Sequence, residues 1–310
     1  MNGCQRMVLG IALTSFLGSF ASSAQAAFDG IYVFGDSLSD AGNSYAASQG
    51  TTPPSPPYSG GHFSNGPTWV DYLAQRLGQS PPTPSSMGGT NFAWGGAQSG
   101  IGPSPVLTPN LVQQAANFVD SGRTFQPNDL VTIWTGGNDF LTAKQTNPDV
   151  VARNIASAIM RLEGVGARRF VVPNLPLLGQ LPLTSNVTDL ERANLNALTT
   201  AFNASLEAQL KNLETTLPVQ IYRVDVASKV QEVIANPSAF GFSNVTKGAL
   251  QDNNTSGQGY LFWDDVHPTT AGHQLIGDLA AAAIPEPSSL VVVGTLGLAG
   301  IFWARRRRAA

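Results

Sequence analysis

The sequence predicts an α/β protein in which a parallel sheet lies between two layers of helices, a three-layer α/β/α sandwich. Two observations predict this class. Short apolar runs of β type alternate along the chain with longer amphipathic segments. No internal repeat or linker interrupts residues 27–284, a length sufficient for one domain with a full hydrophobic core.

Four short apolar runs, each followed by turn residues, predict the strands. They are residues 31–34, 130–134, 169–172 and 220–224. Five segments with apolar residues at helical spacing predict helices. They are residues 68–77, 111–119, 149–162, 189–217 and 271–283. The stretches 45–61 and 79–87 are rich in Pro and Ser and are predicted to be surface loops.

Residues 1–26 have the composition of a secretory signal peptide. Arg6 supplies a positive start, residues 7–20 an apolar core, and Ala24-Gln25-Ala26 a small-residue cleavage site. The core is too short to favour a membrane anchor. The only cysteine, Cys4, precedes this core, so we expect no lipidation. Cleavage would leave a chain without disulfides, a thiolate nucleophile or a thiolate metal site.

The other end of the chain carries three features in order. Pro285-Glu286-Pro287 precedes an apolar run at residues 288–304, and four arginines follow at 305–308. The run is just long enough to cross a thin bilayer, with the arginines on the cytoplasmic side. An ordinary membrane anchor would explain such a helix. The three parts together resemble the PEP-CTERM sorting signal of Gram-negative bacteria, which implies processing by an exosortase-type membrane protease.

The chain between these ends is acidic. Residues 27–284 contain 12 Lys and Arg against 19 Asp and Glu, a formal net charge of −7. An acidic domain does not favour nucleic acid as a partner. Its low overall charge and its many Gly, Ser, Thr, Asn and Pro residues are typical of an exported protein with long loops.

Polar residues directly follow two of the predicted strands. The first strand ends in Gly35-Asp36-Ser37, and the second leads into Thr135-Gly136-Gly137-Asn138-Asp139. A serine at the end of a buried strand is held by rigid backbone at the edge of the sheet, where open α/β sheets bind their ligands. On its own, Gly-Asp-Ser predicts only a turn after a strand.

A serine hydroxyl attacks at neutral pH only with help from a base, usually a histidine that a carboxylate orients. The chain has three histidines. His62 lies in a Gly-rich loop and His273 within the last predicted helix, so each is expected to be structural or solvent-exposed. His267 differs because Asp264 precedes it by three residues and Pro268 follows it. On a turn, that spacing directs both side chains to one place, although most such pairs are merely exposed.

An oxyanion also needs N–H donors that are held in place beforehand. Residues 88–97 form a Gly-rich segment that matches neither the dinucleotide fingerprint nor a phosphate-binding loop. No Lys or Arg lies near the Gly-rich turns to support a nucleotide-binding module. Glycines also let backbone N–H groups approach a substrate closely, and Asn138 offers a side-chain amide.

Five segments, in this order, resemble the GDSL lipase/esterase branch of the SGNH hydrolases. They are residues 34–43 (FGDSLSDAGN), 63–66 (FSNG), 91–97 (NFAWGGA), 136–139 (GGND) and 262–268 (FWDDVHP). Together they span nearly all of residues 27–284. The resemblance implies the SGNH hydrolase fold, whose central sheet is mainly parallel and flavodoxin-like.

Carried over by position, the resemblance implies that Ser37 is the nucleophile. His267 would act first as base and then as acid, with Asp264 orienting it. Asp265 is the rival carboxylate, which the spacing in the family disfavours.

The resemblance also implies an oxyanion hole. Its donors would be the backbone N–H of Ser37, the backbone N–H of Gly96 and the side-chain amide of Asn138. Gly95 remains the alternative to Gly96. Neither a metal nor an organic cofactor is implied.

Together these features predict a secreted serine esterase or lipase that hydrolyses carboxylic esters through an acyl-enzyme. A polysaccharide or glycan O-deacetylase, or an acyltransferase, would use the same triad. A non-catalytic surface or matrix-binding protein is the alternative from another class, but no catalytic residue is missing. An α/β-hydrolase is disfavoured because the chain contains no Gly-x-Ser-x-Gly.

The expected partners are an ester substrate (a lipid, small ester or acylated glycan), signal peptidase and an exosortase-type protease. The expected location is the periplasm, cell surface or exterior of a Gram-negative bacterium, with transient inner-membrane anchoring by the C-terminal helix. His62 and Trp94 stand where many relatives carry Arg and smaller residues. Natural substrate, acyl chain length and oligomeric state therefore stay open.

Overall fold

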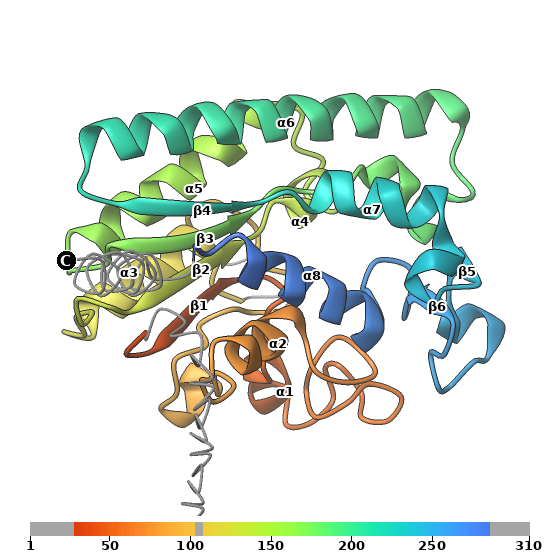
Figure 1. The fold of residues 1–310 in the computed structure, drawn as a ribbon, viewed down its shortest axis with the longest axis horizontal. Coiled ribbons are helices and arrows are strands. Elements are labelled where there is room, and N and C mark those ends of the chain that lie inside the picture. The colour runs from red at the N-terminus through yellow and green to blue at the C-terminus, as the bar shows by residue number, and fades with distance from the viewer. Residues whose placement is uncertain (1–27, 103–107, 286–310) are drawn as a thin grey trace, which may run out of the picture. The chain divides into compact units, whose positions relative to one another are not determined.

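Four parallel strands form the central sheet of the protein (Figure 1). The computed structural model describes residues 28–102 and 108–285. Across the sheet, the strands follow one another in chain order. They are β1 (Ile31–Gly35), β2 (Leu130–Trp134), β3 (Arg169–Pro173) and β4 (Gln220–Val224). The four predicted strands are therefore confirmed, and two of them are one residue longer than predicted.

Residues 90–94 run alongside the outer edge of β1 without forming a regular strand. The N–H of Val33 donates to the carbonyl of Thr90 at 3.0 Å, and the carbonyl of Val33 accepts from the N–H of Phe92 at 2.6 Å. In a parallel pair of strands, the N–H and the carbonyl of one residue bond to two different residues of the neighbouring strand, as Val33 does here. With this segment included, the order across the sheet is that of flavodoxin, with the second segment outside the first. The predicted flavodoxin-like sheet is confirmed.

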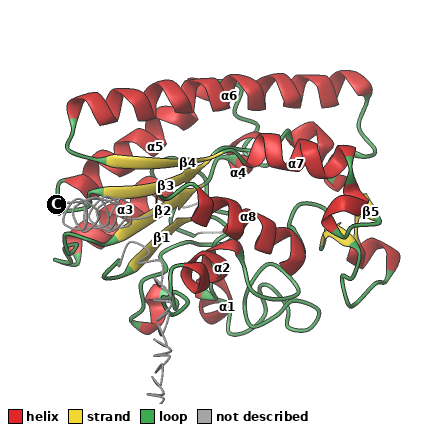
Figure 2. Ribbon diagram, viewed as in Figure 1, coloured by secondary structure: helices red, strands yellow, loops and turns green. Residues whose placement is uncertain are grey.

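Helices cover both faces of the sheet, so the predicted three layers are also confirmed (Figure 2). Helices α3, α5 and α6 pack together on one face, and α2 and α8 pack together on the other. The helices are α1 (Asn43–Ala47), α2 (Trp69–Arg76), α3 (Leu111–Asp120), α4 (Gly137–Leu141), α5 (Pro148–Glu163), α6 (Asp189–Thr216), α7 (Val226–Ala235) and α8 (Thr270–Ala282).

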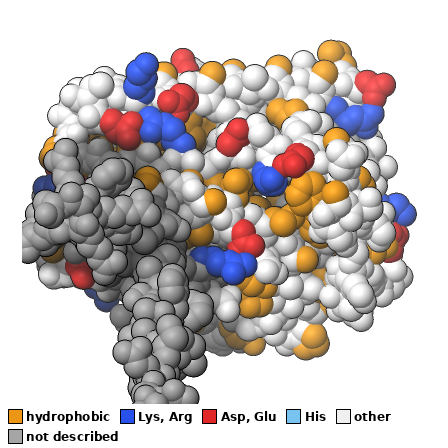
Figure 3. Space-filling model, viewed as in Figure 1, with side chains coloured by type: hydrophobic (Ala, Val, Ile, Leu, Met, Phe, Trp, Pro, Cys, Tyr) orange, Lys and Arg blue, Asp and Glu red, His pale blue; other side chains and the backbone are white. Residues whose placement is uncertain are grey.

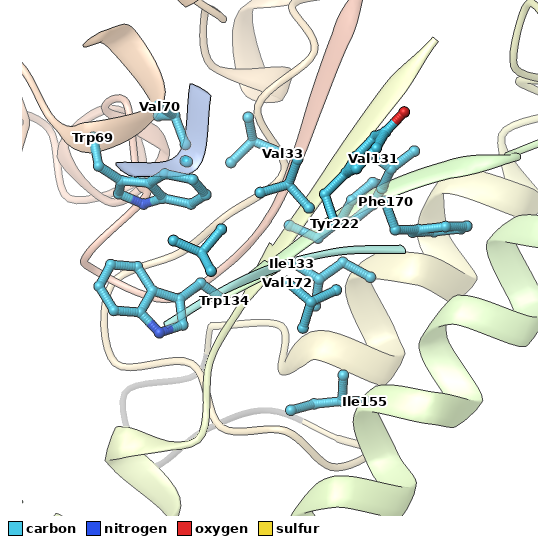
Figure 4. Close-up of a cluster of buried hydrophobic side chains, with 14 of the residues drawn as sticks. Val33, Trp69, Val70, Val131, Ile133, Trp134, Ile155, Phe170, Val172 and Tyr222 are labelled. Carbon is cyan, nitrogen blue, oxygen red and sulfur yellow. The ribbon is translucent and has the colours of Figure 1, made fainter. Parts of the chain in front are cut away.

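Side chains of the strands alternate between the two helical layers. Figure 4 shows Trp134 of β2 next to Trp69 of α2, whereas Ile155 of α5 lies on the other side of the sheet. The two indole rings meet edge to face with centroids 5.5 Å apart, a favoured arrangement for buried aromatic rings. This apolar core holds the ends of the strands in place.

The prediction of a loop over residues 45–61 is wrong for its first three residues, which belong to α1. The cause is the buried carboxylate of Asp40, which accepts the backbone N–H groups of Gly42, Asn43 and Ser44 at 2.7–3.1 Å. A side chain that satisfies these free donors starts a helical turn where the Pro-rich composition predicts a loop.

Four further elements are not among the predicted ones. Helix α4 has only five residues, and β5 (Asn244–Gly248) is mostly polar. Helix α7 has ten residues with valines at helical spacing, a pattern that the prediction missed. Strand β5 pairs in parallel with β6 (Tyr260–Phe262) to form a separate two-stranded sheet. This small sheet matters for function because the segment that contains His267 follows β6 directly.

No helix within residues 28–102 and 108–285 is long and apolar enough to span a bilayer. The predicted signal peptide (1–26) and the predicted membrane helix (288–304) lie outside the described residues. The boundaries at 26/27 and 284/285 stay predictions.

Gly35 ends β1 in a conformation that favours glycine, with φ of +149°. A Cβ at this position would lie 2.2 Å from the carbonyl oxygen of Trp134 on the neighbouring strand. The side chain of Gln114 bonds both to the N–H of Gly35, at 2.9 Å, and to its carbonyl, at 2.8 Å. The chain therefore leaves the sheet at a fixed point, two residues before Ser37.

We expect Gly35→Ala to destabilise the protein by about 2–4 kcal/mol, because the added methyl group collides with rigid backbone. Gly78→Ala is the matched control, since Gly78 also has a positive φ (+70°) but no described atom within 4 Å of the added Cβ. It should lose only about 1–2 kcal/mol. Urea unfolding curves measure both values. Equal losses would mean that the close approach to Trp134 does not matter.

Candidate active site

Ser37 lies in a tight turn directly beyond the carboxyl end of β1. The carbonyl of Asp36 accepts the N–H of Ser39 at 3.0 Å and that of Asp40 at 3.1 Å, while its side chain accepts the N–H of Leu38 at 3.0 Å. The turn is nearly buried, and only 7% of the surface of Ser37 is exposed. The serine is therefore held by its own backbone at the edge of the sheet.

His267 and Asp264 lie on a short hairpin that follows β6. The hairpin is closed by the N–H of Trp263, which donates to the carbonyl of His267 at 2.7 Å. Inside it, Oδ1 of Asp264 accepts the backbone N–H groups of Val266 at 2.8 Å and of His267 at 2.7 Å. One carboxylate oxygen thus folds the loop and leaves the other oxygen free for a different partner.

A continuous chain of hydrogen bonds connects Asp264 to Ser37. Nδ1 of His267 lies 2.7 Å from Oδ2 of Asp264, and Nε2 lies 2.7 Å from Oγ of Ser37. Because Nδ1 faces a carboxylate, we assign the ring proton to Nδ1, and Nε2 then accepts the hydroxyl proton of Ser37. The structure thus brings together the three residues that the sequence predicts as a triad.

The rival carboxylate points elsewhere. The side chain of Asp265 contacts the amide of Gln251, and its carbonyl accepts the N–H of Leu183 at 2.9 Å. Among the described residues, its carboxylate has no bond to His267.

Tyr58 is a residue at this site that the sequence pattern missed. Its hydroxyl donates to Oδ2 of Asp264 at 2.7 Å, so that this oxygen accepts from both Tyr58 and His267. The ring also stands edge-on to Trp263 and to Phe63, and Phe63 in turn lies 5.3 Å from the His267 ring. Tyr58 comes from the Pro-rich loop, about 200 residues from its partner, so no local signal could have revealed it.

The electrostatics of the site follow from burial and from these bonds. Burial disfavours the charge on Asp264, but the charge of His267 and the hydrogen bonds from His267 and Tyr58 outweigh it and hold the pKa of Asp264 well below its ordinary range. Burial also acts to lower the pKa of His267, yet Asp264, helped by Asp36, raises it above the ordinary value. Burial raises the pKa of Asp36 to about 7.

The two predicted glycine donors differ in what their N–H groups do. The N–H of Gly95 already donates to Oδ2 of Asp40 at 2.9 Å and to Oγ of Ser44 at 2.8 Å. A Cβ on Gly95 would also lie 2.3 Å from the ring of Phe63. Gly95 is therefore a packing and bridging residue, and its N–H is not available to a substrate.

Gly96 has a free donor at the right place in the chain. Its φ is +76°, and its N–H has no partner among the described residues. Residues on both sides of Gly96 are anchored. The backbone N–H of Trp94 donates to the carbonyl of Gly35 at 3.1 Å, and the carbonyl of Ala97 accepts the side-chain N–H of Asn138 at 3.0 Å. These bonds hold Gly96 between the end of β1 and the start of α4.

Asn138 keeps one side-chain N–H available. Its amide group has two N–H donors, and the bond to the carbonyl of Ala97 uses only one of them. The next residue, Asp139, accepts both the N–H and the hydroxyl of Ser99 at 2.9 and 2.7 Å. This second link fixes the Gly-rich segment to α4 and orients the amide next to Ser37, with which it shares a cavity wall.

The other two histidines do not contact Ser37. His273 is fully buried on α8, where Nδ1 accepts the N–H of Trp69 at 3.3 Å. Burial, with the nearby charges of His267 and His62, lowers the pKa of His273 to about 3. His62 lies 3.6 Å from Asp71. No group of His, Cys, Asp or Glu within the described residues is arranged to hold a metal ion.

Two sequence comparisons identify the parts of the chain. The pattern of the GDSL-like lipase/acylhydrolase family matches residues 31–280. The chain belongs to this family. The PEP-CTERM protein-sorting motif matches residues 283–308, so the resemblance of both segments is confirmed. As a GDSL-like lipase/acylhydrolase, the protein is a carboxylic ester hydrolase.

Relatives of this GDSL protein include enzymes of both acyl hydrolysis and acyl transfer. The chain is 27% identical to a phosphatidylcholine-sterol acyltransferase of Aeromonas hydrophila, over 85% of this chain and 92% of that protein. It is 25% identical to a GDSL esterase/lipase of Arabidopsis thaliana, over 90% of this chain and 97% of that protein. Among solved structures, an M. smegmatis aryl esterase is 18% identical over 82% of this chain and 95% of that chain, with a TM-score of 0.46.

We expect His267 to titrate above the ordinary histidine value of about 6.5. Asp264→Asn removes the charge that raises this pKa but keeps the burial that lowers it, so the titration should move to lower pH. Asp265→Asn is the matched control and should leave it in place. NMR of the imidazole protons measures all three proteins. An unchanged titration in Asp264→Asn would contradict this account of the charge on His267.

Proposed function

We propose that the protein is an exported serine esterase or lipase that hydrolyses carboxylic esters through an acyl-enzyme on Ser37. The observation that carries the proposal is the chain of 2.7 Å hydrogen bonds from Asp264 through His267 to Ser37. A loop histidine or a serine in a turn is usually structural. A base within hydrogen-bond distance of a serine, itself oriented by a carboxylate, is the arrangement that activates a nucleophile.

In the first step, Oγ of Ser37 forms a bond to the carbonyl carbon of the ester while its proton moves to Nε2 of His267. The imidazolium that results is stabilised by the ionised Asp264. The carbonyl oxygen becomes an oxyanion, which accepts the backbone N–H groups of Ser37 and Gly96 and the free side-chain N–H of Asn138. These donors are held before the charge forms, so they need no reorganisation.

The tetrahedral intermediate then breaks its bond to the alcohol oxygen. His267 gives its proton to this oxygen, the alcohol leaves, and the acyl group remains on Ser37. A water molecule next loses a proton to His267 and attacks the acyl carbon. Ser37 leaves with that proton, and the carboxylic acid is released.

Tyr58 serves as a positioning residue in this scheme. Its hydroxyl holds the same carboxylate oxygen that orients His267, so it limits the rotation of Asp264. It also stabilises the charge of a partly buried carboxylate, for which an unsatisfied lone pair would be unfavourable.

The export route follows from the two ends of the chain. The PEP-CTERM motif indicates export and membrane anchoring in a Gram-negative bacterium. We assign residues 1–26 to a signal peptide that signal peptidase removes, residues 27–284 to the hydrolase domain, and residues 285–310 to the sorting signal. An exosortase-type protease would process the last of these, and the apolar run at 288–304 would anchor the chain transiently in the inner membrane.

Acyl transfer is the second candidate, favoured by the similarity to the Aeromonas hydrophila acyltransferase along most of both chains. It uses the same acyl-enzyme, which an alcohol then attacks in place of water. Glycan O-deacetylation differs only in the ester that is attacked. Product analysis with and without added alcohol or acetylated glycan separates the three reactions.

We expect Ser37→Ala and His267→Ala each to lower kcat for p-nitrophenyl butyrate by roughly a thousandfold or more, because only the oxyanion hole and binding would remain. Asp264→Ala should lose about as much, whereas Asp265→Ala should stay within about threefold of the wild type. Initial rates and circular dichroism check activity and folding together.

Equal activity of the wild type, Ser37→Ala and His267→Ala would refute the triad. A large loss in Asp265→Ala with little change in Asp264→Ala would reverse the assignment of the acid. An inactive wild type that binds acylated glycans would favour the non-catalytic alternative.

A further inference from the structure

An apolar cavity opens next to Ser37. Ser37, Asp36 and Asn138 line it at the end that meets the catalytic groups. Apart from these three and Lys229, every described residue that lines the cavity is hydrophobic, proline or glycine. The cavity is narrow, because the volume open to the centre of a water-sized sphere is about 70 Å³.

Elements from separate parts of the chain supply these walls. Helix α7 presents Val226, Val230 and Val233, which share one face because they are spaced by three or four residues. Helix α8 presents Leu275 and Ile276. Segments that follow β3 and β6 complete the cavity, so it is part of the fold rather than a gap in a single loop.

Lys229 does not place a free charge inside the cavity. Its ammonium group lies 2.5 Å from Oε2 of Glu232 and 5.2 Å from the centre of the Phe240 ring. The aliphatic stem of a lysine can therefore line the wall while its charged end is bound elsewhere. Figure 3 shows hydrophobic side chains gathered on the surface between α7 and α8.

We propose that this cavity binds the acyl chain of the substrate, so that the enzyme prefers esters of medium- to long-chain fatty acids over acetyl esters. The proposal rests on the proposed acyl-enzyme at Ser37. The residues of the wall support it, because a hydrocarbon chain is the ligand suited to an apolar cavity whose free polar groups lie only at the catalytic end.

The other side of His267 suits the alcohol. There an open cleft is lined by Tyr58, Gln251 and Asp265 together with Leu250 and Val266, next to Asp264 and His267. The alcohol must leave before water attacks, and an open cleft allows both. The acyl group stays bonded to Ser37 throughout that exchange, and the apolar cavity next to Ser37 can hold it.

Chain length should therefore act on the acyl side of the ester only. Each buried methylene group contributes enough hydrophobic free energy for roughly a two- to fourfold gain in kcat/KM. We expect kcat/KM for p-nitrophenyl esters to rise from acetate to at least octanoate. Alkyl acetates with longer alcohols, in contrast, should show a nearly flat series.

A bulkier wall should shorten the preferred chain. Val230→Trp, at a half-buried position on α7, should lower the ratio of decanoate to acetate kcat/KM at least tenfold. Ala235→Trp is the matched control, because Ala235 lies exposed on the same helix and outside the cavity. It should keep the wild-type ratio. Leu275→Phe on α8 provides a second test if Val230→Trp does not fold.

A wild-type preference for acetate would overturn the proposal, and so would a series that depends on the alcohol instead of the acyl chain. An unchanged ratio in folded Val230→Trp and Leu275→Phe would overturn it as well. Ser37→Ala on p-nitrophenyl acetate separates these results from failure of the triad, because that ester does not need the cavity.

Discussion

The site depends on one partly buried carboxylate, that of Asp264, whose two oxygens accept four hydrogen bonds. Oδ1 binds two backbone N–H groups and folds the hairpin after β6, and Oδ2 binds Tyr58 and His267. Folding of the loop and orientation of the imidazole are therefore consequences of the same group. Because every partner is a donor, the carboxylate stays ionised despite its burial, and its charge raises the pKa of His267.

A second buried carboxylate, that of Asp40, holds together the segments next to Ser37. It accepts the N–H groups that begin α1 and also the N–H of Gly95, and so joins the serine turn to the Gly-rich segment. Close packing completes this link, since only a glycine fits at position 95 against Phe63. The proposed oxyanion donors are thus fixed by neighbours that have no role in the chemistry themselves.

The main strands and the long helices could be predicted because each has a local sequence pattern, such as the apolar runs of β1 to β4. The three triad candidates could be predicted because five segments of the chain resemble the GDSL family, and the short spacing of Asp264 and His267 agrees with a shared turn. Tyr58 could not be predicted, because its bond to Asp264 depends on how a Pro-rich loop folds over a distant hairpin. Likewise, the different roles of Gly95 and Gly96 depend on where two N–H groups point, and the apolar cavity is built from elements that are far apart in the chain.

The proposed mechanism requires that Ser37, made reactive by His267, forms a covalent bond to the substrate, and covalent trapping tests this requirement most directly. The protein is incubated with an alkyl fluorophosphonate, which reacts with activated serines, and is then analysed by peptide mass spectrometry. We expect a single adduct on Ser37 in the wild type and none in His267→Ala. Ester hydrolysis without any adduct on Ser37, or an adduct on a different serine that abolishes activity, would contradict the proposed mechanism.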